Sequence, residues 1–151
     1  MFSMIRSLFR ELVNDGSESG TADDQSIKLA TAALLCEVSR ADRQYDPREE
    51  EAKIGLLQRL LGLPEAESRA LLKRALVQSE NAISLFDFTN KLRSFTQPQR
   101  FELIKAMWEV AYADDELDPM EEAIIRNVAE LIYVDHADFI RAKLAATANK
   151  Q

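Results

Sequence analysis

An internal repeat at a spacing of 72 residues limits the folds that this chain can adopt. Residues 37–50 align with residues 109–122, and eight of the fourteen aligned positions are identical. Each copy begins in an apolar helical pattern, passes through a short acidic turn and enters a second helical pattern. Because a repeated unit buries its apolar face against a neighbour, the repeat predicts a fold built from two related helix-turn-helix units.

The apolar residues between 27 and 146 recur at helical spacing, and no segment shows the alternation typical of a strand. The expected core helices are residues 27–41, 48–61, 65–77, 83–92, 99–113, 120–132 and 137–146. Helix-ending residues lie between them, among them Gly62, Pro64 and Pro98. The pattern therefore predicts one all-α, seven-helix domain over residues 26–147.

The first 25 residues differ from this domain. Residues 1–13 place Phe2, Ile5 and Phe9 at helical spacing, with Arg6 and Arg10 one turn apart on another side. Residues 14–25 contain two glycines and no large apolar residue, so they predict a flexible, acidic linker. The short amphipathic helix is expected to dock on its own domain first, with a partner groove or peripheral membrane contact as alternatives.

The composition excludes several classes of protein. The 26 acidic and 19 basic residues give a net charge of −7, which opposes binding to nucleic acid. With Cys36 as its only cysteine, the chain forms no intrachain disulfide, as is usual in a reducing cytoplasm. There is no membrane-spanning stretch and no recognisable signal peptide, so a cytoplasmic location is expected, with peripheral contact at the inner membrane face as the variant.

Part of the repeated acidic motif predicts a helix start. In Asp46-Pro47-Arg48-Glu49 the aspartate can accept from free amides, and Glu49 can reach back to the Asp46 amide. Proline suits the first helical position. The second copy, Asp118-Pro119-Met120-Glu121, repeats the pattern, so both copies predict a capping box.

Asp42 and Asp114 need a different explanation, because each follows a helix whose negative end disfavours a carboxylate. An Asx turn is one interpretation. The other is an oxygen-ligand site for calcium, magnesium or manganese, although the spacing is not that of an EF-hand. The candidate ligands are Asp42, Asp46 and Glu49 in the first copy, and Asp114, Asp118 and Glu121 in the second. A basic partner surface, or protonation, would also relieve their repulsion.

Other kinds of site find little support. One histidine, His136, and one cysteine do not make a zinc site, and His136 is expected on the surface of the last helix. No phosphate-binding or dinucleotide-binding glycine motif is present. Enzymatic activity is therefore not expected, and a carboxylate-based hydrolase is the distant alternative. A set of large residues is expected in the core: Phe86, Phe88, Phe101, Met107, Trp108 and Tyr112.

The paired motifs Ala41-Asp42 with Glu49 and Ala113-Asp114 with Glu121 resemble the tellurite-resistance TerB family and the wider TerB-like superfamily, over about residues 27–143. The resemblance implies an all-helical fold and an association with stress response, membrane-associated complexes and metal binding through these acidic residues. The superfamily also includes the N-terminal region of a DnaJ-type membrane co-chaperone.

The chain departs from the family at one position, because Arg43 and Asp115 follow the aspartate where the family often has glycine. Arg43 would place a positive charge where a cation would bind, so metal binding is favoured in the second copy. The expected function is a non-enzymatic TerB-like accessory module in stress response or metal handling. It would bind a divalent cation or a partner protein through the duplicated acidic turns. The alternative is a metal-independent protein–protein adaptor resembling the co-chaperone region.

Overall fold

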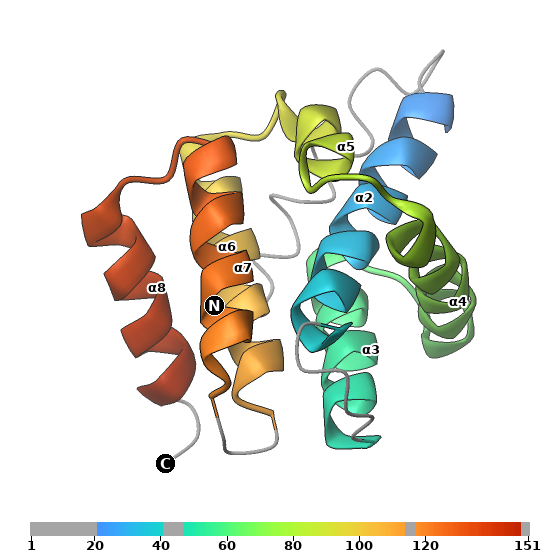
Figure 1. Ribbon diagram of the computed structural model, residues 1–151. Helices are drawn as coiled ribbons and strands as arrows, with labels where there is room; N and C mark the ends of the chain where they lie inside the picture. Colours follow the sequence, from blue (N-terminus) through green and yellow to red (C-terminus); the bar gives the residue numbers. More distant parts are fainter. Residues whose placement is uncertain (1–20, 41–46, 114–116, 149–151) are drawn as a thin grey trace.

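A computed structural model of the protein describes residues 21–40, 47–113 and 117–148. This part of the chain contains α-helices and one 3₁₀ turn, with no strand among the described residues (Figure 1). The elements are α2 (Thr21–Arg40), α3 (Pro47–Leu61), α4 (Glu65–Asn81), α5 (Phe86–Thr89), η1 (Asn90–Leu92), α6 (Gln97–Ala111), α7 (Pro119–Leu131) and α8 (His136–Ala148). The predicted all-α class is confirmed.

The helices form two units of the same order, α2–α3–α4 and α6–α7–α8. In each unit the first helix packs mainly against the third, α2 against α4 and α6 against α8. The two first helices contact each other, and each also contacts the second helix of the other unit. In Figure 1, α4 and α8 accordingly lie at opposite sides of the bundle. The repeat in the sequence thus appears as an approximate twofold arrangement of two helical units.

The core lies around α2 and α6. Residues 30–36 of α2 are all buried, and α6 buries Leu103, Ile104 and residues 106–108. A helix that is apolar on most of its sides needs neighbours on most of its sides. α2 has them, because α3, α4, α6 and α7 all pack against it. The long apolar run around Cys36 therefore predicts a central helix, and Cys36 is a buried thiol.

Capping boxes begin α6 and α7. The Thr96 amide donates to Oε1 of Gln99 at 2.7 Å, and the Gln99 amide donates to Oγ1 of Thr96 at 3.4 Å. At α7 the Met120 amide donates to Oδ1 of Asp118 at 2.7 Å, and the Asp118 amide donates to Oε1 of Glu121 at 3.2 Å. The predicted capping box of the second copy is confirmed. Asp46, which would cap α3, lies outside the described residues.

Three predicted boundaries differ from the structure by three residues or more. α2 begins at Thr21, inside the predicted linker, because the apolar pattern marks only the part of a helix that packs. α4 continues to Asn81 beyond the predicted end at residue 77. The predicted helix over residues 83–92 begins only at Phe86, and Ile83 is 97% exposed. The Asp87 carboxylate accepts from the Ile83 and Ser84 amides at 3.1 and 3.3 Å, which holds a turn before α5.

Most of the large residues expected in the core are there. Met107, Trp108 and Phe88 are buried, and Phe101 and Tyr112 are half-buried. Phe86 is the exception at 50% exposure, because the helix that would have turned it inward is a single short turn. His136 is exposed at the first position of α8, as predicted. Residues 1–20, which contain the predicted amphipathic helix, lie outside the described part.

Candidate functional site

Two buried glutamates mark equivalent places in the two units. Glu49 is the third residue of α3 and Glu121 the third residue of α7, with 2% and 1% of their surface exposed. Both carboxylate oxygens of Glu49 and Oε2 of Glu121 are inaccessible to solvent. Burying an ionised carboxylate costs free energy unless opposite charge or hydrogen bonds compensate it. The position therefore requires a positive environment in both units.

In the second unit the start of α7 supplies part of that environment. Glu121 accepts the Asp118 amide through Oε1 and lies in the first turn, where the positive end of the helix dipole favours a carboxylate. Asp118 is half-buried beside it and caps the same turn. The structure therefore brings together two of the three candidate ligands of this copy, while Asp114 lies outside the described residues.

In the first unit a lysine lies close to the equivalent glutamate. Lys53 is buried one helical turn after Glu49, and its Nζ donates to Oγ of Ser39 at 2.8 Å. The repeat places Ile125 and Ala111 at the corresponding positions of the second unit, and both are buried. The first unit thus carries a buried ammonium group near its acidic turn, whereas the second has apolar side chains there.

The predicted ligand sets are described only in part. Asp42, Asp46 and Asp114 lie outside the described residues, so the convergence of each triad stays a prediction. Among the residues that are described, no three histidine, cysteine, aspartate or glutamate side chains form a group able to hold a metal ion. Glu49 and the Asp118–Glu121 pair are therefore the described parts of the candidate ligand sets.

A cavity of about 790 Å³ lies between α3, the end of α6 and the end of α8. We call it the Gly55 groove. Its apolar lining is Ala52, Gly55, Leu56, Ala113 and Ala146, and its charged lining includes Arg48, Glu51, Arg59 and Glu109. Arg59 Nη2 lies 3.4 Å from Oε1 of Glu109, which links α3 of the first unit to α6 of the second.

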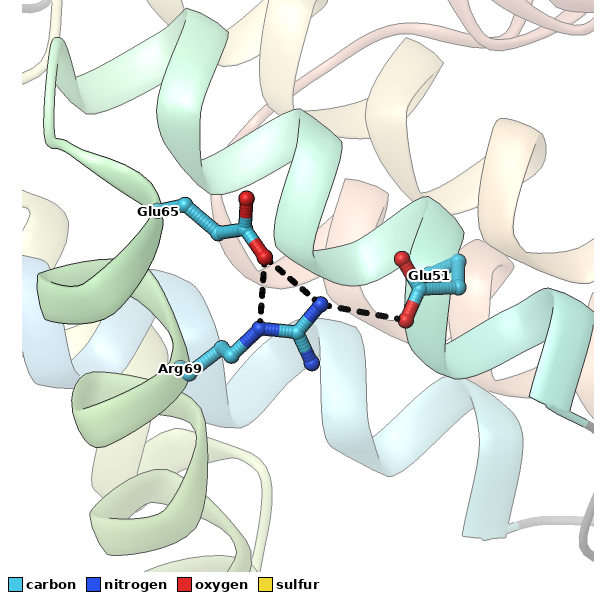
Figure 2. Close-up of polar contacts among 3 residues, drawn as sticks. All are labelled: Glu51, Glu65 and Arg69. Carbon is cyan, nitrogen blue, oxygen red and sulfur yellow. Dashed lines mark hydrogen bonds and ion pairs between the residues drawn. The ribbon is translucent and has the colours of Figure 1, made fainter.

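An exposed cluster of ion pairs includes Glu51, one of the residues that line this groove. Arg69 contacts Glu65 at 2.8 Å on the same helix and Glu51 of α3 at 3.4 Å (Figure 2). The hydrogen bond that Arg69 donates to Glu65 raises the pKa of Arg69; desolvation opposes this rise, and the charges of Glu51 and Glu65 add to it. Exposed ion pairs add little to the free energy of unfolding. The consequence of this cluster is positional, because it ties Glu51 to the start of α4.

Sequence reasoning did not identify two features of this region. Lys53 is a lysine in a helix start rich in charges, and lysines are mostly exposed. Comparison of the two copies carries the signal, because the apolar Ile125 at the matching position indicates that residue 53 faces the core. The sequence also contains an indication of the Gly55 groove. A glycine inside a helical pattern lowers the stability of the helix, so its presence indicates a packing or functional role.

Comparison with known proteins identifies the family of this chain. The family model of tellurite resistance protein TerB matches residues 28–144, which is more than half of the chain and includes both units. No curated protein and no solved structure is similar enough to count as a match. No helix in the described part of the chain is long and apolar enough to cross a membrane. The chain is therefore a member of the TerB family.

Proposed function

We propose that this chain is a non-enzymatic accessory module in stress response or metal handling that binds a hard divalent cation at its acidic turns. The observation that supports the proposal is the burial of Glu121 and Glu49 at equivalent positions, each in a turn rich in carboxylates. Carboxylate oxygens are the ligands that calcium, magnesium and manganese prefer. A cation would compensate the buried charge where the turn meets the helix.

The second unit is the stronger site in this proposal. In the first unit Lys53 holds a buried positive charge one turn from Glu49, and this charge competes with any bound cation. In the second unit the apolar Ile125 stands at that position, so no charge from residue 125 competes with a cation beside Glu121. Asp115 and Glu116 add two further carboxylates to the second turn, where the first has Arg43 and Gln44.

The test is a titration of the full, chelator-treated chain with calcium, magnesium and manganese, followed by thermal unfolding. A ligand that binds only the folded state raises the free energy of unfolding by about 2.7 kcal/mol at a concentration one hundred times its Kd. We expect a saturable rise in Tm that Asp114→Asn and Glu121→Gln abolish. Asp42→Asn, the matched control in the first unit, should leave most of it. No shift at millimolar cation would contradict the proposal.

A metal-independent adaptor is the second candidate, and the surface around α5 favours it. Four large apolar side chains near the end of α4 and the start of α5 are exposed: Leu76 at 41%, Val77 at 53%, Ile83 at 97% and Phe86 at 50%. Large apolar side chains that a fold leaves exposed are candidates for a protein-binding surface.

This adaptor predicts no response to cations. It also predicts that a cellular partner captured by cross-linking is lost with Ile83→Ser, while Lys91→Ser, a change of an exposed polar residue in the adjoining turn, keeps it. Capture that is equal for the two variants would contradict the adaptor.

A further inference from the structure

We propose that the amphipathic segment formed by residues 1–13 docks in the Gly55 groove of its own chain. The proposal is independent of cation binding, because neither the segment nor the groove supplies a candidate ligand. It rests on four features of the described residues and of the sequence: an unexplained glycine, the size of the groove, the charge of the two parts and the length of the connection.

Gly55 is the first feature. It lies inside α3, where glycine costs about 1 kcal/mol relative to alanine. A Cβ atom built on Gly55 meets no atom within 4 Å from the other described residues, leaving aside its own turn of helix, so the packing of the described helices does not require glycine. Glycine is favoured where another backbone must approach closely. We infer that a further segment of chain passes over α3 at this residue.

The second feature is size. The charged lining on α3 runs from Arg48 to Arg59, which is about 16 Å along a helix at 1.5 Å per residue. A helix over residues 2–13 would be about 18 Å long. The groove volume of about 790 Å³ has room for several large side chains. The segment offers Phe2, Ile5 and Phe9 at helical spacing, as helix-in-groove binding requires.

Charge is the third feature. Residues 1–13 contain Arg6, Arg10 and Glu11 and have a net charge of +1. Since the whole chain has a net charge of −7, the rest of the chain has a net charge of −8. The groove itself presents the carboxylates of Glu51 and Glu109 beside the guanidinium groups of Arg48 and Arg59, so these four charges cancel and the attraction comes from the domain as a whole and from the exposed Glu51. Glu51 is 64% exposed at its side chain and can accept a second arginine beside Arg69. Attraction therefore favours docking of the segment on the domain and orients its arginines toward these carboxylates.

The length of the connection is the fourth feature. Seven residues, 14–20, separate the segment from the start of α2 at Thr21. Fully extended, they span at most about 25 Å, which is close to the length of α3 at about 22 Å. α2 and α3 pack side by side. A tether this short gives an effective concentration of roughly millimolar order, so weak contacts suffice for docking.

The first experiment measures proximity by disulfide formation in the full chain. Phe9→Cys is combined with Gln58→Cys, which lines the groove and leaves Gly55 unchanged. The matched control combines Phe9→Cys with Glu130→Cys, at the position that the repeat aligns with Gln58. The second experiment uses Asn127 as its control. Asn127 is the exposed residue that the repeat places at the position of Gly55 in the second unit. Cys36 is fully buried and does not compete. We expect the 9–58 disulfide to form at least about tenfold faster than the 9–130 disulfide.

The second experiment fills the groove and measures trypsin cleavage after Arg6 and Arg10. Gly55→Leu should speed this cleavage at least about fivefold, because proteolysis follows the undocked population, while Asn127→Leu leaves the rate unchanged. Circular dichroism checks that both variants stay folded. Equal disulfide rates for the two pairs, or equal cleavage in the two leucine variants, would overturn the proposal. Binding of the full chain to anionic vesicles without a preferred 9–58 disulfide would overturn it too, and would assign the segment to a membrane surface.

Discussion

The two helical units share one arrangement but fill it with different side chains. In the first unit Cys36 is buried on α2, which packs against α4, and α4 carries the buried Ser68. In the second unit the repeat replaces Cys36 with Trp108, whose ring lies 5.2 Å from that of Phe139 on α8. All four residues are buried. The comparison teaches that the pattern of buried positions and helix ends determines this fold. Each unit packs its interior with different side chains.

The two units also differ in a partly buried polar pair, in the residues that follow their second helices and in one charged residue. Lys53 and Ser39 pair in the first unit where the second has Ile125 and Ala111. Gly62 ends α3 in the left-handed region at φ 67°, and Tyr133 adopts φ 62° after α7. Buried Ala30 on α2 matches Glu102 on α6. Substitutions that make one unit resemble the other test how much each of these differences contributes to the free energy of unfolding.

Trp108→Ala should have the largest effect. Trp108 is fully buried against Tyr112 and Phe139, so its removal leaves a cavity and should lower the free energy of unfolding by about 4 kcal/mol. Cys36→Ala, the matched change in the first unit, removes one sulfur atom and should cost about 1 kcal/mol. Urea unfolding followed by circular dichroism measures both. If both changes lower the free energy of unfolding by a similar amount, the packing between the first and third helices does not differ between the two units.

Ile125→Lys should have the next largest effect, about 3 kcal/mol, because it buries an ammonium group where the second unit has no serine to accept from it. Adding Ala111→Ser copies the arrangement of the first unit and should restore about 1 kcal/mol. The same variant should weaken cation binding at Glu121, because it introduces the competing charge. Unfolding curves that show no gain from Ala111→Ser would mean that Ser39 contributes nothing to holding Lys53.

The sequence predicts the fold well where the helices carry explicit end signals. Pro47, Gly62 and Pro119 place the boundaries of α3 and α7 within one residue. The errors occur where a helix turn carries no large apolar residue, as at residues 21–26 and at the end of α4. There Ser79 is buried and donates to Glu37 on α2, a tertiary contact that periodicity does not reveal.

The candidate site is less predictable than the fold. The repeat identifies Glu49 and Glu121 as equivalent, and the capping box of Asp118 follows from local chemistry alone. The burial of both glutamates depends on how the units pack, and single-sequence patterns do not contain that information. Lys53 is a partial exception, because its charge suggests exposure while the apolar Ile125 at the matching position of the other copy indicates that residue 53 faces the core.

Tyr133→Gly should stabilise the chain by about 1 kcal/mol. The left-handed backbone region suits glycine and costs other residues about 1 kcal/mol or more. Tyr133 is 80% exposed, so little buried surface is lost with its ring. Gly62→Ala is the reverse change and should destabilise by a similar amount. If Tyr133→Gly lowers the midpoint of urea unfolding instead, the tyrosine ring contributes a contact that outweighs the backbone cost.

Glu102→Gln should have the smallest effect, and its dependence on pH identifies the cause. Burial raises the pKa of Glu102 above its ordinary value of 4.5, Glu109 adds to the rise, and Lys105 and Arg59 oppose it. An acid whose pKa is raised by folding destabilises the fold when ionised. The penalty is therefore present above the folded pKa and disappears as the pH falls toward 4.5.

At pH 7 Glu102→Gln should accordingly raise the free energy of unfolding by about 0.5 kcal/mol, a value reduced by the partial exposure of the side chain. The difference from the unchanged chain should vanish near pH 4, where both side chains are neutral. Urea unfolding at pH 7, 5.5 and 4 measures it, with Glu130→Gln on the exposed side of α7 as the control. A difference that stays constant across this range would exclude the charge of Glu102 as its cause. The Glu102 side chain would then differ from Ala30, its counterpart in the first unit, without an electrostatic cost to the fold.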